Sequence, residues 1–320
     1  MIKLDVVYNL AGLVFAAYAL LSARDATNPR RGRNALFWGL LAASFLVGDR
    51  LGDIGNGVLA MVLAVTAGVG QLGRGTAWES TLADRQASAY RFGNRLFLPA
   101  LAIPVVVLFG TLVVKTWRLG DVPLLDPKQA TLISLAAAAL LAVGLAFVLF
   151  RQPLITPLQE GARLIDMVGW AALLPQMLAA LGALFALAGV GRVVGDLITT
   201  WIPIDSRLAA VVVYCLGMAM FTIVMGNAFA AFPVMTAGVA LPFLVHKFGA
   251  DPAVVCAIGM LSGFCGTLMT PLAANFNIVP TALLELKDRF AVIRAQVPTA
   301  LPLLLINMVL MYVFAFRSHG

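Results

Sequence analysis

The chain has 320 residues, of which 61% are hydrophobic and 12% charged, and its mean hydropathy is +0.96. Soluble domains carry about 25% charged residues, so this composition excludes an ordinary soluble domain and predicts an all-α polytopic membrane protein. The net charge of +7 comes with no long run of Lys or Arg, so we expect basic residues that flank membrane spans and no nucleic-acid partner.

Uncharged runs predict about nine transmembrane helices, since roughly 20 apolar residues cross the hydrocarbon core. We expect the first run to be retained as a span, because it is long for a signal peptide. Placing the N-terminus outside puts the Arg-rich loops after the first and third spans in the cytoplasm. In chain order, the runs of single-span length and one shorter run are 6–23, 34–48, 54–73, 96–114, 129–150, 167–191 and 295–316.

The segment 151–166 interrupts this pattern with Pro153, Pro157 and charges of both signs. We interpret it as a joint between two membrane halves. Residues 1–158 then form a scaffold-like half, and residues 159–320 form the half that carries a functional site.

Two uncharged runs are too long for one span. Residues 208–245 make a run of 38 residues and residues 252–284 one of 33, whereas a span needs about 20. Helix-breaking residues lie near the middle of both runs, so we predict broken or re-entrant helices. The predicted break residues are Pro233, Gly266 and Pro271, with Gly226 and Asn227 beside the first break.

Broken helices at membrane depth suggest a binding site, because unpaired backbone groups survive there only where protein covers them or they line a cavity. Half-helix N-termini suit anions, whereas carbonyl and side-chain oxygens suit Na⁺. The alternative is that these polar residues only join and pack helices. The candidate residues for binding a solute or ion are Gly226, Asn227, Thr267, Thr270, Asn275 and Asn277.

A further candidate lies early in the run 167–191, where Pro175 predicts a helix break and Gln176 a polar lining for the pathway. Packing within the bundle is the alternative for both residues. Elsewhere, the GxGxxG match at 68–73 reads as a helix end, because no strand precedes it. Gly191 and Gly195 form a GxxxG spacing that favours helix packing.

No Asp, Glu, Lys or Arg lies in the middle of a predicted span, and Asp166 and Asp196 lie at run edges. Proton coupling usually needs a carboxylate or His within the membrane, so sodium coupling or uncoupled movement fits better. We therefore expect no cofactor, with a sodium ion as the candidate coupling ion. The sequence shows no metal-ligand cluster and no nucleophile paired with a base, so we expect no enzyme.

The stretches GWAALLPQMLAALGALFALAGVG, MGNAFAAFPVMTAGVALP and GTLMTPLAANFNIVPTALLELKD carry a family resemblance. On them the chain resembles a bacterial membrane family catalogued as domain of unknown function 979, over nearly its whole length. Members are often encoded beside a second membrane protein and a peptidase that releases N-terminal pyroglutamate. The resemblance implies a permease, or half of one, for pyroglutamate or a related small carboxylate.

The same stretches are similar, more distantly, to the ion-transporter superfamily of carboxylate permeases, whose broken helices hold substrate and sodium. This similarity implies that Asn227 and the stretch 267–277 hold solute or ion, although the strict Ser-Asn-Thr triplet is absent. Those permeases have two inverted repeats, whereas this chain has one pair of breaks. The similarity thus implies a second membrane subunit or a homodimer.

Three functions remain open. The leading hypothesis is a secondary transporter, or one subunit of a two-component permease, for a small anionic or zwitterionic solute in the bacterial inner membrane. The second is a non-transporting membrane subunit that stabilises or regulates a partner. The third is a channel or a membrane enzyme.

Overall fold

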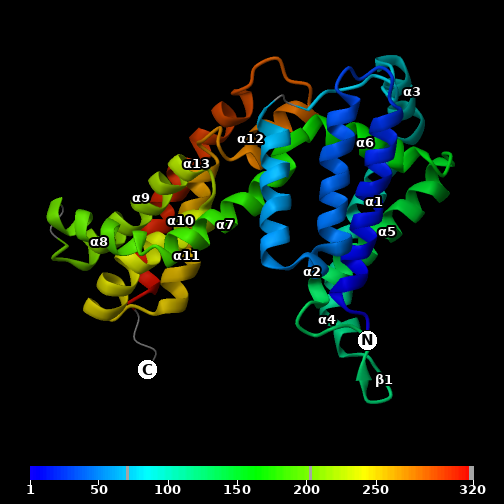
Figure 1. Ribbon diagram of the computed structural model, residues 1–320. Coiled ribbons are helices and arrows are strands. Elements are labelled where there is room, and N and C mark those ends of the chain that lie inside the picture. Colours follow the sequence, from blue (N-terminus) through cyan, green and yellow to red (C-terminus); the bar gives the residue numbers. More distant parts are fainter. Residues whose placement is uncertain (70–71, 202–203, 317–320) are drawn as a thin grey trace. The chain divides into compact units, whose positions relative to one another are not determined.

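The computed structural model describes residues 1–69, 72–201 and 204–316, and these are mostly helical (Figure 1). Eight helical segments within them are long and apolar enough to cross a membrane, and Pro252–Thr267 is a shorter apolar helix. The prediction of an all-α polytopic membrane protein is confirmed. The eight segments are Leu4–Arg24, Arg31–Gly68, Ala83–Thr116, Ala130–Phe150, Thr156–Leu187, Arg207–Met225, Ala228–Lys247 and Ala291–Phe314.

The chain divides into two compact units, Met1–Gly169 and Trp170–Gly320. The sequence predicts a scaffold-like half, residues 1–158, and a half that carries the functional site, residues 159–320. These two roles stay a prediction.

Unit 1 is a helical bundle with a short hairpin. A two-stranded antiparallel sheet pairs Arg118 with Pro123 and Leu119 with Val122. Its elements are α1 (Leu4–Arg24), α2 (Arg31–Gly68), α3 (Leu82–Phe92), η1 (Gly93–Phe97), α4 (Leu98–Leu112), η2 (Val114–Thr116), β1 (Arg118–Leu119), β2 (Val122–Pro123), α5 (Ala130–Phe150) and α6 (Thr156–Val168).

The helix α2 is two helices joined at Gly52, whose φ of +63° and ψ of −176° interrupt the helical backbone. The Nδ2 atom of Asn56 donates to the carbonyl of Gly48 at 2.9 Å, across this turn. Figure 1 shows the two parts running side by side. The uncharged runs 34–48 and 54–73 fall on either side of this turn, so α2 contains the first predicted span and residues 54–68 of the second.

Aromatic rings fill the core of unit 1 between α1 and α2. Trp38 is fully buried, and the ring of Phe15 stacks on it with a centroid separation of 6.0 Å. Phe15 also stacks on Phe45 at 5.6 Å. Between α4 and α5, a Cβ atom at Gly110 would meet the side chain of Ser134, so these two helices approach closely at a small residue.

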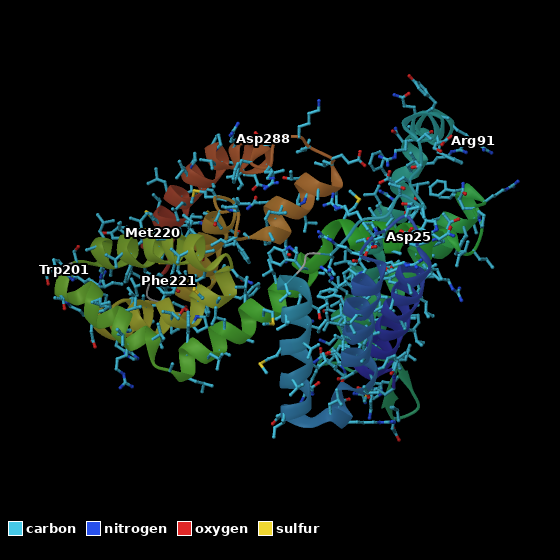
Figure 2. All side chains as sticks on the ribbon, turned by 45° about the horizontal axis from the view of Figure 1, so that its top comes forward. Asp25, Arg91, Trp201, Met220, Phe221 and Asp288 are labelled. Carbon is cyan, nitrogen blue, oxygen red and sulfur yellow. The ribbon has the colours of Figure 1, made fainter. Side chains whose placement is uncertain are left out.

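Unit 2 is built around the long helix α9, which packs against α11 and α13. Tyr214, Met218, Met235 and Met311 are buried in its core, and Met220 on α9 is exposed (Figure 2). Its elements are the 3₁₀ turn η3 (Gly169–Leu173) at its border, α7 (Leu174–Leu187), α8 (Val190–Trp201), α9 (Arg207–Met225), α10 (Ala228–Met235), the π-helical segment η4 (Thr236–Lys247), α11 (Pro252–Thr267), α12 (Ala274–Leu283) and α13 (Ala291–Phe314).

The GxxxG spacing packs helices, as predicted. A Cβ atom at Gly191 would lie 2.8 Å from the carbonyl of Val234, and one at Gly195 would lie 2.6 Å from that of Gly238. The backbone of α8 therefore rests directly on the end of α10 and on η4.

Candidate functional site

The first helix break is a two-residue step between α9 and α10. Gly226 ends α9 in the left-handed region, with φ +76°, and its N–H donates to the carbonyl of Thr222 at 2.7 Å. Asn227 is extended and starts α10, because its Oδ1 atom accepts the N–H of Phe229 at 2.8 Å. These are a glycine C-cap and an asparagine N-cap. The run 208–245 therefore breaks near its middle as predicted, but at Gly226 and Asn227, which the sequence placed beside the break.

Pro233, by contrast, lies inside α10, and the helix does not break there. The chain continues from α10 into η4, which begins at Thr236. Proline removes one backbone donor, but local π-helical geometry and neighbouring helices let a membrane helix accommodate it.

The second break covers residues 268–273, between α11 and α12. Pro271 lies within it, as predicted. Gly266 lies inside α11 and breaks nothing, because its role is close packing. A Cβ atom there would collide with the carbonyl oxygen of Ala219, so Gly266 lets α11 approach the backbone of α9.

Asn277, on the first turns of α12, closes the second break. Its Nδ2 atom donates to the carbonyl of Thr267 at 2.9 Å and to that of Thr270 at 2.6 Å, and the residue is fully buried. The hydroxyl of Thr267 donates to the carbonyl of Phe264 at 2.6 Å. Side-chain donors thus add to the backbone bonds at the end of α11, where the carbonyl of Phe264 also accepts the N–H of Leu268 at 3.2 Å.

The two breaks touch each other within unit 2. The hydroxyl of Thr270 donates to the carbonyl of Ile223 on α9 at 2.9 Å. A Cβ atom at Gly226 would lie 2.7 Å from the carbonyl oxygen of Leu272, so only glycine fits against the second break. Segments about 45 residues apart in the sequence therefore form one polar contact.

A cavity of about 20 Å³ adjoins this contact. The start of α10 and the start of α12 both line it, so two half-helix N-termini with partial positive charge reach the same space. A cavity needs roughly 10–15 Å³ to hold one water, so this state admits a water-sized group, and a larger solute requires it to widen. The lining residues are Leu174, Leu178, Gly226, Asn227, Leu272, Ala273, Ala274, Asn275 and Phe276.

Six of the candidate residues separate into two groups at this site. Gly226, Asn227 and Asn275 line the cavity, and Asn275 is exposed. Thr267, Thr270 and Asn277 lie behind it in the second break, where they are buried.

Gln176 is not among the residues that line the cavity. Among the described side chains of α7, Leu174 and Leu178 line the cavity, whereas Gln176 is exposed. Pro175 lies in the first turn of α7, where proline is compatible with the start of a helix. Its side chain lies outside the described residues.

Sequence reasoning missed two features. The first is Thr222, which is fully buried one turn before Gly226. The sequence indicates its place near the break only through its spacing of four residues from Gly226. In unit 1, Asp166 was placed at the edge of a run, yet it is 7% exposed. The indole Nε1 atom of Trp38 donates to the Oδ1 atom of Asp166 at 2.7 Å.

This carboxylate belongs to a buried polar cluster near the turn between α1 and α2. The Nδ2 atom of Asn34 donates to the carbonyl of Gly73 at 2.8 Å, and the Oδ1 atom of Asn34 accepts the N–H of Gly73 at 2.9 Å. Asp25, in that turn and 3% exposed (Figure 2), accepts the N–H and the hydroxyl of Thr27. These hydrogen bonds hold the loop at Gly73 against the start of α2. We therefore interpret the cluster as structural.

The comparisons with known proteins agree with the resemblance drawn from the sequence. The family model described as "Protein of unknown function (DUF979)" matches residues 5–316. No curated protein and no solved structure matches the chain. Because the family model covers nearly the whole chain, this multi-pass helical membrane protein belongs to the DUF979 family.

Proposed function

We propose that this protein is a secondary transporter, or the solute-binding subunit of a two-component permease, for a small carboxylate or amino-acid-like solute such as pyroglutamate. The observation that carries the proposal is the meeting of two helix breaks at one cavity, with the N-termini of α10 and α12 at its wall. Transporters place discontinuous helices around their substrates in this way.

The charge of the cavity wall favours an anionic group. Helix N-termini stabilise a nearby negative charge by about 0.3–1 kcal/mol each, and by up to about 2 kcal/mol where the geometry is partly buried. The side chains of Asn227 and Asn275 add amide groups. No carboxylate lines this cavity within the described part of the chain.

The proposed location is the bacterial inner membrane, with a second membrane subunit or a second copy of the chain as partner. Pyroglutamate is named as the solute because of the family resemblance and because of the proteins encoded beside members of that family. The cavity itself supports only the wider class of small carboxylates.

Uptake of labelled pyroglutamate tests the proposal, in bacterial cells that lack their own route. The chain is expressed alone and with the second membrane protein encoded beside such genes. Saturable uptake that requires this chain is the expected result. Uptake by the second protein alone would instead make this chain an accessory subunit.

Variants at Asn227 separate a binding role from helix capping. Asn227→Ser keeps a side-chain oxygen for the N-cap but removes the amide donor, so uptake should fall while the amount of folded protein is unchanged. Gln176→Ala is the matched control, because it removes an amide that lies outside the cavity wall. Equal uptake by the Asn227→Ser variant and the wild type would exclude Asn227 as a ligand.

A further inference from the structure

Several segments of unit 1 meet at the end that holds the turn between α1 and α2. The loop before α3 is joined to this turn, because the hydroxyl oxygen of Thr27 accepts the N–H of Thr76 at 2.8 Å. The same loop is joined to α6, because the guanidinium of Arg74 donates to the carbonyl of Met167 at 3.2 Å. These contacts bring the ends of α1 and α6 and the start of α2 to one surface.

The helix α3 and the end of α5 lie at this surface as well (Figure 1). The ring of Phe92 on α3 meets that of Phe150, the last residue of α5, with centroids 4.9 Å apart. The side chains of Tyr90 and Phe97 are 91% and 63% exposed, and Arg91 between them is also exposed (Figure 2). Exposed aromatic rings beside basic residues are typical of segments at the level of the lipid headgroups.

Arginine dominates the charge of this surface, which we call the arginine end. It carries ten arginines and five acidic residues. Of these acidic residues, only Glu79 and Asp84 are exposed, whereas nine of the arginines are. The tenth arginine, Arg163, pairs with Glu160 at 2.9 Å. The exposed arginines are Arg24, Arg30, Arg31, Arg33, Arg74, Arg85, Arg91, Arg95 and Arg151.

The opposite end of unit 1 has no excess of positive side chains. Ile2 forms a bridge with Leu125 there, beside the β1–β2 hairpin. The turn at Gly52 lies at the same end, because the first part of α2 runs antiparallel to α1. Five basic and five acidic residues share this end: Lys3, Asp5, Asp49, Arg50, Asp53, Lys115, Arg118, Asp121, Asp126 and Lys128.

Like charges on one surface repel each other, so counter-charges from outside the chain stabilise the arginine end. The first turn of α2 contains no acidic residue, and its helix dipole adds to the positive charge. Membrane spans end at this surface, so it lies at the level of the lipid headgroups. A guanidinium group binds phosphate through two parallel hydrogen bonds. The phosphate of an anionic headgroup is therefore a counter-charge of matching chemistry.

We propose that the arginine end of unit 1 binds the phosphate groups of anionic phospholipids. A zwitterionic phospholipid carries its own positive group beside the phosphate, so it is a poorer counter-charge. Lipid binding at this surface is independent of the proposed transport function, since the surface belongs to unit 1 and the cavity to unit 2.

Thermal unfolding of the purified full chain in mixed micelles of detergent and lipid tests the surface. Phosphatidylglycerol is compared with phosphatidylcholine that has the same acyl chains. We expect phosphatidylglycerol to raise the Tm by about 2 °C or more above that in phosphatidylcholine, in a saturable manner that weakens at high salt. Equal Tm values in the two lipids would overturn the proposal. An equal rise with inorganic phosphate would overturn the assignment to a lipid.

Two triple variants locate the binding surface. Changing Arg31→Gln, Arg91→Gln and Arg95→Gln together removes three exposed charges from the arginine end and should lower the phosphatidylglycerol-dependent rise by roughly a third or more. The matched control combines Lys115→Gln, Arg118→Gln and Lys128→Gln, which removes the same charge from the opposite end and should keep the full rise.

Native mass spectrometry of the same variants counts the bound lipid molecules, independently of Tm. The first triple variant should bind fewer phosphatidylglycerol molecules than the wild type, and the control should bind as many. Equal losses in both triple variants would show a response to net charge alone and would refute the assignment to the arginine end.

Discussion

Replacing Gly226 by alanine probes the first break directly. The residue has a φ of +76°, a conformation that costs an L-residue roughly 1–2 kcal/mol. The new Cβ atom would also lie 2.7 Å from the Leu272 carbonyl oxygen, closer than the 3.4 Å at which ordinary contacts begin. Overpacking of this kind costs about 1–3 kcal/mol. The variant should therefore lose about 2–5 kcal/mol of stability.

Two other glycines separate these contributions. Gly249 has a φ of +69° but open space around its Cβ position, so Gly249→Ala should lose only roughly 1–2 kcal/mol. Gly144 is helical and equally open, so Gly144→Ala should gain up to about 1 kcal/mol from helix propensity. Thermal unfolding in detergent should rank the variants as Gly144→Ala, Gly249→Ala and Gly226→Ala, in order of falling Tm.

Each departure from this order has a definite meaning. Equal Tm values for Gly226→Ala and Gly249→Ala would show that the two breaks are not in tight contact. A Tm for Gly226→Ala as high as that of Gly144→Ala would refute the left-handed turn itself. Uptake should also fall in Gly226→Ala, since Leu272 lines the cavity.

Three further predictions concern structure away from the cavity. Trp38→Phe should destabilise unit 1 by about 1–3 kcal/mol, because Asp166 loses a buried donor. Combining it with Asp166→Ala should lower the free energy of unfolding by less than the sum of the two single changes, and a simple sum would contradict the hydrogen bond. Gly195→Leu should lower the Tm by several degrees, since even a Cβ atom would lie 2.6 Å from the Gly238 carbonyl; an unchanged Tm would exclude the close contact. Thr81→Ala removes a capping box and should cost about 1 kcal/mol, seen as faster hydrogen exchange in α3 alone; unchanged exchange would exclude the cap.

The position of both breaks could be predicted from the sequence, because membrane thickness limits the length of a span. A run of 38 uncharged residues must turn, and a Gly-Asn pair near its middle supplies a C-cap and an N-cap in succession. The same argument applied to the run 252–284 and placed a break around Pro271. In both runs, the length of the uncharged segment and the residues near its middle predict a break in the same place.

The roles of Pro233 and Gly266 could not be predicted in this way. A proline in a membrane helix is compatible with a break, a kink or a helix that continues, and the neighbouring helices decide between them. Gly266 matters because the backbone of Ala219 lies against it. That contact joins residues far apart in the sequence, so no local pattern contains it.

Asp166 shows the same limit in unit 1. The sequence places it only at the edge of an uncharged run. Burial of this group depends on Trp38, which lies 128 positions away in the sequence. Run edges predict where a chain leaves the membrane, whereas burial of a charged group is decided by tertiary packing.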